Sequence, residues 1–296
     1  MIDADDEGPR PESGPGFTEA VTFSFGDAEA DLYGSARVGL SPATSTLSAL
    51  AVVFSGSEPV AVRAEGGIAA AEVSWKDVEA AGLRARVDEP LRSWSTAFSG
   101  DDGGGFELTF TAVAPAFEFG AESAVARSGG MEGYEHLCRV EGTVTVAGRP
   151  ARLRCLGQRG HAWGSTDWER LERTASVSAW IADDRAFALE TIRPRNAPGH
   201  DAEVVSLVAL EAGETGLALT PALDPRLSTT YDADGRHRRA SLEFWLEEEG
   251  YARRAAGAAR CGTTLELGRL RMDSAFFAWT MDGEQGVGRY EVLRRA

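Results

Sequence analysis

The sequence predicts an all-β fold of antiparallel strands. Short runs of apolar and β-branched residues alternate with polar residues at a period of two, and Gly, Pro and Asp interrupt these runs. Apolar residues that recur at the 3.6-residue period of a helix are nearly absent. Strands spaced in this way are typical of sandwiches and barrels, and closure into a barrel removes exposed sheet edges. We therefore expect β-barrels with little helix.

The N-terminal half begins with a segment of different character. Residues 1–16 are acidic, rich in Pro and Gly and poor in apolar side chains, so we expect a disordered acidic tail. Runs with strand patterns follow it at 21–25, 32–40, 47–54, 60–64, 91–98 and 106–113. Between these runs, residues 75–82 predict a helical turn that ends at a Gly, and the Gly- and Asp-rich residues 100–105 predict a loop.

The clearest hairpin lies at the centre of the sequence. Apolar and polar residues alternate over 138–146 and again over 151–155. This alternation predicts two strands that each bury one face. The turn between them contains Gly148, which reaches positive φ without steric cost.

The register of this hairpin predicts which side chains meet at its far end. If the chain pivots near Gly148, then Glu135 or His136 falls opposite residues 160–162. We therefore expect His136 and His161 to lie near one another at one end of the sheet.

The C-terminal half repeats the same strand pattern. Its apolar runs lie at 175–181, 186–192, 204–210, 242–246, 270–281 and 287–293. The run Arg236-His237-Arg238-Arg239 reads as the solvated start of a strand. We expect two β-domains, residues 17–156 and residues 157–296, after the tail of residues 1–16.

Composition excludes several partners. The net charge is −16 with a single lysine, Lys76, and no run of Lys or Arg, so we expect no nucleic-acid partner. No stretch of about 18 apolar residues occurs, so we expect no membrane span. The N-terminus lacks the apolar core of a signal peptide.

The cysteines favour a reducing compartment. Cys138, Cys155 and Cys261 form no CxxC pair and are odd in number. Cys138 and Cys155 can face one another across the central hairpin, but buried free thiols are the simpler interpretation. We expect a cytoplasmic protein.

Metal and nucleophile chemistry find little support in the sequence. The histidines His136, His161, His200 and His237 lack the spacing of known zinc motifs, although His200 precedes an Asp. No G-x-S-x-G motif and no phosphate-binding loop before a helix occurs. We expect neither a bound metal nor a cofactor.

The candidate catalytic residues lie in and near the stretch 157–168, which reads G-Q-R-G-H-A-W-G-S-T-D-W. His161, Glu135 and Asp167 are candidates for acid/base work, because a carboxylate desolvated by aromatic side chains has a raised pKa. In the alternative interpretation, Asp167 caps a turn and His161 donates to a backbone carbonyl.

Aromatic and polar residues around these candidates could line a ligand pocket. The candidate ligand-binding residues are Tyr134, His136, Arg159, Trp163, Trp168, Trp180 and Trp279. An Arg among aromatic rings can stack on them or pair with a carboxylate. The alternative is that the Trp side chains only fill the barrels.

Three stretches carry a resemblance to a known family: residues 157–168, Tyr134-Glu135-His136, and residues 286–291, which read G-V-G-R-Y-E. The sequence resembles the hydroxyneurosporene synthase-like family, also called carotenoid 1,2-hydratase-like, which includes actinobacterial members of unknown function. The resemblance implies two packed antiparallel lipocalin-like β-barrels with a pocket for a small hydrophobic metabolite.

The resemblance also implies an activity. It points to a lyase or isomerase in secondary metabolism that hydrates, cyclises or rearranges an isoprenoid or a polyketide by acid/base assistance and confinement. Gly160 stands where the family often has Asp before the His, so Glu135 or Asp167 would have to supply the acid. The alternative functions are a non-catalytic carrier for a hydrophobic ligand and a structural or interaction protein whose barrels are filled. Oligomers are possible in each case.

Overall fold

The computed structural model describes residues 2–12, 14–70, 72–199, 202–213, 216–247 and 249–296. Within these residues the chain is nearly all β, which confirms the predicted fold class. The helical elements there are short: η1 (Ala4–Glu7), η2 (Pro42–Thr44) and α1 (Ala124–Gly129). No helix in the described part of the chain has the length and apolar character needed to cross a membrane.

The chain forms two compact units. Unit 1 comprises Met1–Gly120 and Met131–Thr166, and unit 2 comprises Ala121–Gly130 and Asp167–Ala296. Each unit is a curled antiparallel sheet with a barrel-like form, in keeping with the predicted lipocalin-like architecture.

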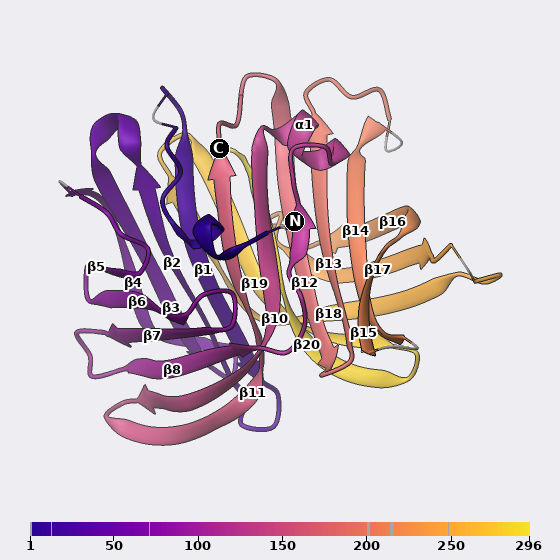
Figure 1. Cartoon of the computed structure of the whole chain (residues 1–296). Helices are drawn as coiled ribbons and strands as arrows, with labels where there is room; N and C mark the ends of the chain where they lie inside the picture. The colour runs from indigo at the N-terminus through magenta and orange to yellow at the C-terminus, as the bar shows by residue number, and fades with distance from the viewer. Residues whose placement is uncertain (1, 13, 71, 200–201, 214–215, 248) are drawn as a thin grey trace. The chain divides into compact units, whose positions relative to one another are not determined.

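Unit 1 is built on an 11-stranded sheet with the order β4-β3-β2-β1-β11-β10-β8-β7-β6-β5, and β9 pairs with β10 (Figure 1). Its strands are β1 (Thr18–Asp27), β2 (Leu32–Ser41), β3 (Thr46–Ser55), β4 (Glu58–Ala69), β5 (Asp77–Ala80), β6 (Leu83–Glu89), β7 (Ser93–Ser99), β8 (Gly105–Ala112), β9 (Phe117–Phe119), β10 (Met131–Val146) and β11 (Arg149–Gly164). Strand β11 lies between β1 and β10, at the centre of the sheet.

Unit 2 is built on a 9-stranded sheet with the order β15-β14-β13-β12-β20-β19-β18-β17-β16. Its strands are β12 (Leu171–Ala182), β13 (Arg185–Pro194), β14 (Val204–Gly213), β15 (Gly216–Pro221), β16 (Leu223–Tyr231), β17 (His237–Trp245), β18 (Arg253–Leu267), β19 (Leu270–Met281) and β20 (Glu284–Arg295). Helix α1 contacts β13 and β14, and a Cβ on Gly129 would come within 2.7 Å of the Ile192 side chain.

The central hairpin has the predicted turn and register. Ala147 and Gly148 both have positive φ, 49° and 74°, which matches the twist of the strands they join. Glu135 of β10 lies opposite Gly160 of β11, as predicted. The turn residues and the alternation of the strands are enough to set this register, because both are local features.

Both units bury an apolar face of the sheet. In unit 1, Phe23 of β1 packs edge-on against Phe110 of β8, with ring centroids 5.1 Å apart. In unit 2, Phe187 of β13 packs against Trp279 of β19 at 5.3 Å. These cores follow from the period of two, which places alternate residues of each strand on one side.

The domain boundary differs from the prediction. We expected a division between residues 156 and 157, but the compact units divide between Thr166 and Asp167. The reason is that β11 continues to Gly164 and pairs along that length with β1. The helical turn predicted at 75–82 is also wrong, since Asp77–Ala80 form strand β5.

The N-terminal segment differs from the predicted disordered tail. Asp3 caps η1 through its side chain, and Glu7 is only 3% exposed. Figure 1 shows this segment in indigo against the strands of unit 1. Composition suggests disorder here because the segment has few apolar side chains, but Glu7 is held by polar contacts instead.

Candidate functional site

Buried polar side chains gather at one end of the inner face of unit 1. We call them the His161 cluster; its members are Glu19 of β1, Tyr134 and His136 of β10, and Arg159 and His161 of β11. His161 lies opposite Val21 on β1 and opposite Tyr134 on β10. Partners across antiparallel strands share a face, so the cluster continues the apolar inner face that contains Val21.

The hydrogen-bonded pair at the centre of the cluster is fully buried. His161 Nε2–H donates to Glu19 Oε1 at 2.7 Å, and neither side chain is exposed. The indole N–H of Trp75 donates to the same oxygen at 2.8 Å, and the backbone N–H of Arg10 donates to Glu19 Oε2 at 3.1 Å. Glu19 therefore accepts on both oxygens, which assigns the ring proton of His161 to Nε2 and leaves Nδ1 as a proton acceptor.

Tyr134 lies beside that acceptor. Its hydroxyl is 3.4 Å from His161 Nδ1 and also 3.4 Å from the carbonyl oxygen of Asp6. Burial raises the pKa of Tyr134 to about 12, although the charge of Arg159 acts to lower it. Burial lowers the pKa of His161, and its hydrogen bond to Glu19 opposes that shift. At neutral pH, Tyr134 thus keeps its proton while His161 is a neutral base.

Arg159 extends the cluster toward the N-terminal segment. Its Nη2 pairs with a carboxylate oxygen of Glu7, and both side chains are almost completely buried. The guanidinium also lies over the rings of Trp94 and Tyr134, with its Cζ 4.9 and 5.2 Å from their centroids. Its Nε and Nη1 atoms are buried without a hydrogen-bond partner.

His136 is the second member of the His161 cluster that has a buried nitrogen atom without a hydrogen-bond partner. Its ring lies 5.0 Å from that of Trp94 and 5.7 Å from that of Tyr134, and its Nδ1 is buried without a partner. Burial lowers the pKa of His136 to about 3, and the nearby charge of Arg159 acts in the same direction. Unsatisfied buried groups cost free energy, and Arg159 and His136, which lie opposite one another on β11 and β10, both leave nitrogen atoms without partners. Their pairing makes this cluster a candidate site.

Trp163 lies at the rim of the cluster. It is half-buried, and its ring is 5.3 Å from that of His161 and 6.1 Å from that of Tyr134. The guanidinium of Arg10 covers the ring at 3.6 Å. The structure therefore brings together the predicted residues Tyr134, His136, Arg159, His161 and Trp163.

Glu135 does not lie in this cluster. Neighbouring residues of a strand point to opposite faces, so Glu135 faces away from Tyr134 and His136. Its carboxylate instead accepts a hydrogen bond from Gln158 Nε2 on that other face. Gly160 faces the same way, because a Cβ there would lie 2.6 Å from Thr22 Oγ1. Glu19, and not Glu135, supplies the carboxylate that His161 contacts.

Asp167 and Trp168 belong to unit 2 and not to the cluster. Asp167 is exposed, and its side chain accepts from the backbone N–H of Glu169 at 3.0 Å. This is the turn-capping role of the alternative interpretation. The carbonyl of Trp168 accepts from Arg295 at 3.2 Å.

Trp180 and Trp279 are buried in unit 2. Trp279 is 0% exposed and packs in the core against Phe187 and Phe277. Trp180 is buried outside that core cluster. Their indole N–H groups have no hydrogen-bond partner. Trp279 is thus a core residue, as the alternative interpretation had it.

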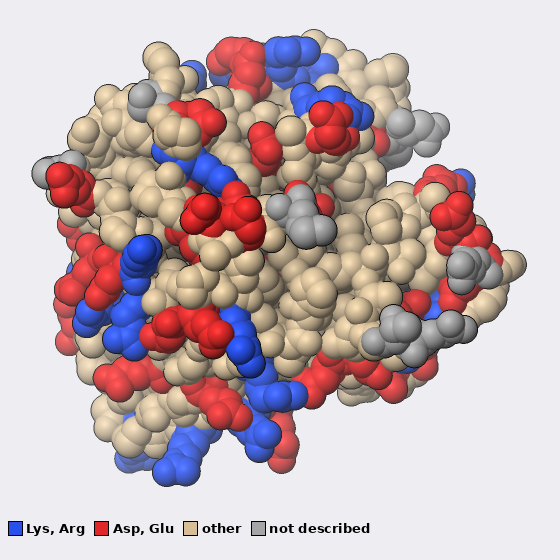
Figure 2. Space-filling view, viewed as in Figure 1, with Lys and Arg blue, Asp and Glu red and all other residues tan. Residues whose placement is uncertain are grey.

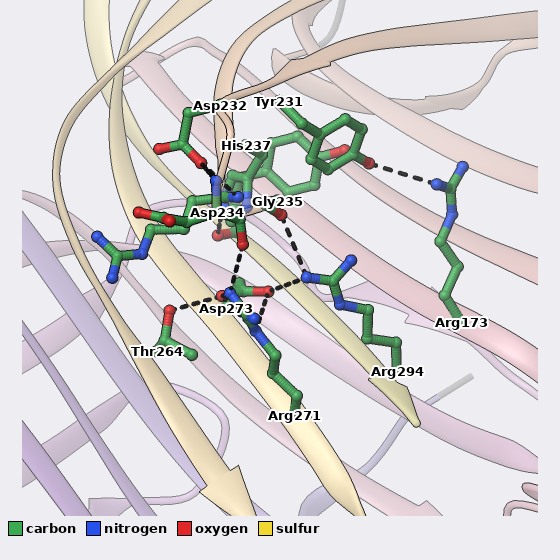
Figure 3. A network of polar contacts seen from close by, with 12 residues as sticks. Arg173, Tyr231, Asp232, Asp234, Gly235, His237, Thr264, Arg271, Asp273 and Arg294 are labelled. Atoms are coloured by element: carbon green, nitrogen blue, oxygen red, sulfur yellow. Dashed lines mark hydrogen bonds and ion pairs between the residues drawn. The ribbon is translucent and has the colours of Figure 1, made fainter. Parts of the chain in front are cut away.

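Unit 2 contains a polar network of its own (Figure 3). We call it the Asp273 cluster; its members are Asp273, Arg271, Arg294 and Thr264. Arg271 and Arg294 donate to Asp273 at 3.0 and 3.1 Å, and Thr264 donates at 2.6 Å. Burial would raise the pKa of Asp273, but these hydrogen bonds and charges hold it below its ordinary value.

His237 lies near this network and corrects another prediction. It begins β17, as expected for a strand start, but it is 3% exposed and not solvated. Its ring stacks on Phe277 at 5.4 Å, and its Nε2 donates to the carbonyl of Tyr290 at 2.9 Å. Burial lowers the pKa of His237, and that hydrogen bond opposes the shift.

A surface groove of about 580 Å³ also lies in unit 2, on strands β16 to β19. Its lining includes Arg226, Ser241, Glu243, Arg254 and Thr280, and none of the predicted site residues lines it.

No group of three or more His, Cys, Asp or Glu side chains in the described part of the chain is arranged to hold a metal ion. His200 lies outside the described residues. Cys138, Cys155 and Cys261 are free thiols. Since Cys138 lies opposite Gly157 and Cys155 opposite Val140, the hairpin register does not place the first two face to face.

Charge is dispersed over the surface seen in Figure 2, where Lys and Arg side chains lie among Asp and Glu. Some exposed charged side chains of the protein form pairs, such as Arg84 with Asp77 at 2.5 Å. Such pairs contribute little to stability.

Sequence reasoning missed Glu19, Glu7, Trp75 and Trp94. A signal for Glu19 exists, because it precedes Val21 and Phe23 at the period of two and so shares their buried face. Glu7 carries no comparable signal, since it lies in a run of acids.

The chain belongs to the DUF7064 family, a domain of unknown function, whose model matches residues 3–296. No protein of curated function matches the sequence.

Solved structures of other proteins share the fold. Kievitone hydratase from Nectria haematococca is 12% identical, with a TM-score of 0.66 over 94% of this chain and 88% of that chain. CghA is also 12% identical, with a TM-score of 0.63 over 95% and 89%. A Nitrosomonas europaea protein provisionally named AttH is 15% identical, with a TM-score of 0.65 over 93% and 91%. At these identities the likeness is one of fold.

Proposed function

We propose that the chain is a lyase- or isomerase-type enzyme that acts on a hydrophobic metabolite, with the His161 cluster as its catalytic site. The observation that carries this proposal is the 2.7 Å contact between His161 and Glu19, both fully buried at the end of an apolar barrel interior. A neutral His whose tautomer is fixed by a carboxylate is the usual form of a general base.

In the proposed reaction, His161 and Tyr134 handle one proton each. His161 Nδ1 accepts a proton from the substrate, and the Tyr134 hydroxyl donates one at another position of the substrate. The imidazolium then returns its proton to the phenolate, from which it is 3.4 Å away, and both residues regain their starting forms. Moving a proton between two positions is an isomerisation, and the same pair can add or remove water.

The apolar surroundings support a hydrophobic substrate. Phe23 lies opposite Arg159 on the neighbouring strand, so the polar cluster adjoins the aromatic core. Confinement of a flexible isoprenoid or polyketide in one conformer would lower the entropic part of the barrier. Structures of the same fold include a hydratase and CghA with Sch210972, which supports a small-molecule substrate.

The test is native mass spectrometry of the protein isolated from its producing cells, followed by incubation of fresh protein with any metabolite that co-purifies. We expect a hydrophobic metabolite and a product that is either its isomer or differs from it by one molecule of water. His161→Gln should abolish turnover, whereas Glu135→Gln should retain it, because residue 135 lies on the other face of the sheet. A metabolite that binds but is unchanged would indicate a carrier instead.

A further inference from the structure

Glu7 occupies a binding site for a carboxylate. Its Oε1 accepts from the backbone N–H of Leu91 and from the indole N–H of Trp94, each at 3.1 Å, and its Oε2 pairs with Arg159. Glu7 and Arg159 are 3% and 1% exposed. Charge-assisted hydrogen bonds from a guanidinium, together with neutral N–H donors, are the usual means of binding a carboxylate in a protein interior.

The segment that delivers Glu7 is held by few other contacts. Among the described residues before Phe17, Glu7 is the one that is buried. Outside Glu7, the segment is held mainly by Arg10, through its N–H to Glu19 and its stacking on Trp163, and by the long contact from Tyr134 to the Asp6 carbonyl. It buries little apolar surface, so its displacement would cost little hydrophobic free energy.

The site offers more than Glu7 uses. Arg159 Nε and Nη1 and His136 Nδ1 are buried without partners. A free carboxylate, which is not tethered to the backbone, could engage a second guanidinium nitrogen in the two-pronged geometry that Arg favours. The rings of Trp94, Tyr134 and His136 form an aromatic wall beside it, suited to the apolar body of the same molecule.

We propose that this subsite binds the carboxylate of a hydrophobic organic acid, and that Glu7 is a resident substitute which the ligand displaces. This inference rests on the proposed function, because it assigns the substrate class of the same cluster. The acid group on Arg159 would anchor the molecule so that its apolar part meets Tyr134 and His161.

The experiment measures binding of cis-parinarate, a fluorescent polyene acid, and of its methyl ester to the full-length chain. In the wild type, the acid can bind only in the fraction of molecules from which Glu7 has left the site, and the apparent affinity falls in proportion to that fraction. Glu7→Ala removes this internal competitor, so we expect the affinity for the acid to rise about tenfold or more. The ester should bind no better than before. Adding Arg159→Met to Glu7→Ala should abolish the gain.

Asp5→Ala is the matched control, because Asp5 is an exposed acid of the same segment and its loss removes one negative charge in the same way. It should leave the affinity for the acid unchanged. Glu7→Gln, which keeps the shape of the side chain, should show the same direction as Glu7→Ala and covers the case in which Glu7→Ala does not fold.

Thermal melting provides a second readout. Glu7→Ala should melt at a lower temperature than the wild type, because it leaves Arg159 buried and unpaired, and the acid but not the ester should restore the melting temperature. The proposal is overturned if the acid and the ester bind equally to every variant, or if removal of the Glu7 carboxylate weakens acid binding. If the protein binds the acid but converts no metabolite, the proposed function is refuted and the carboxylate subsite is supported. If the protein converts its metabolite equally well with and without a carboxylate on that molecule, the proposed function is supported and the carboxylate subsite is refuted.

Discussion

The two units each bury a carboxylate among basic side chains, but the polar groups around the two carboxylates differ in how completely they are hydrogen-bonded. In unit 2, Asp273 is 2% exposed and accepts from Arg271, Arg294 and Thr264, and both Arg side chains are partly exposed. In unit 1, Glu19 and His161 are fully buried, and the surrounding cluster leaves nitrogen atoms of Arg159 and His136 without partners.

This difference separates a structural network from a candidate site. A network in which every polar group has a hydrogen-bond partner stabilises the packing of the strands and has no unused donor or acceptor for a ligand. A buried network whose donors lack hydrogen-bond partners lowers the stability of the fold, and proteins retain such networks mainly at functional sites. The comparison also indicates that carboxylate and Arg composition alone does not identify the site.

The largest expected effect is on turnover. Glu19→Gln removes the charge that fixes the tautomer of His161, so we expect turnover of the co-purifying metabolite to fall by about 10²–10⁴-fold, the usual range for general acid/base catalysis. Asp273→Asn, the corresponding change in unit 2, should leave turnover per folded molecule unchanged. Equal losses in the two variants, with folding matched by circular dichroism, would remove the distinction between the clusters.

The next effect is on the free energy of unfolding. His161→Ala removes one of the three hydrogen-bond donors to the buried carboxylate of Glu19 and should cost about 1.5–3 kcal/mol. Arg271→Ala removes a partly exposed partner of Asp273 and should cost at most about 1 kcal/mol. Urea titrations measure both. Similar costs would show that the two carboxylates depend on their partners to the same extent.

The pH dependence of stability should report the buried histidines. His136 has its pKa lowered to about 3 in the folded chain, so between pH 6.5 and 3 the unfolded chain binds a proton that the folded chain does not. Stability should therefore fall as the pH falls through this window, by up to about 1.4 kcal/mol per pH unit for this residue. His136→Gln should flatten the decline, measured by urea titration at a series of pH values. A decline of unchanged slope would mean that His136 is protonated in the folded chain.

The smallest expected effect concerns the rim. Arg10→Ala removes the stacking on Trp163 but keeps the backbone N–H that Glu19 accepts, so we expect a loss of about 0.5–1 kcal/mol. Urea titration followed by tryptophan fluorescence measures it. A loss as large as that of His161→Ala would place Arg10 among the buried partners of the cluster and not at its rim.

Local features of the sequence predicted much of the fold. The hairpin register followed from Gly148 and the alternation on either side of it. The same register also determines which face each side chain occupies. Because Glu135 lies opposite Gly160, His161 lies opposite Tyr134, and Glu135 points to the other face of the sheet. The prediction that Glu135 contacts His161 did not take this alternation into account.

The rest depended on contacts that are distant in sequence. Glu19 and His161 are 142 residues apart and meet because β1 pairs with β11, a pairing that no local pattern specifies. Glu7 is farther still, 152 residues from Arg159. Composition predicts disorder for its segment because hydrophobicity measures cannot register a single buried ion pair.

A crystal structure of the protein with its co-purifying metabolite tests the assignment of the site to unit 1 most directly. We expect the metabolite at the His161 cluster, with a polar group within hydrogen-bonding distance of Arg159, Tyr134 or His161. A metabolite seated instead in the unit 2 groove lined by Arg226 and Arg254, with the His161 and Glu19 contact undisturbed and no ligand beside it, would contradict that assignment.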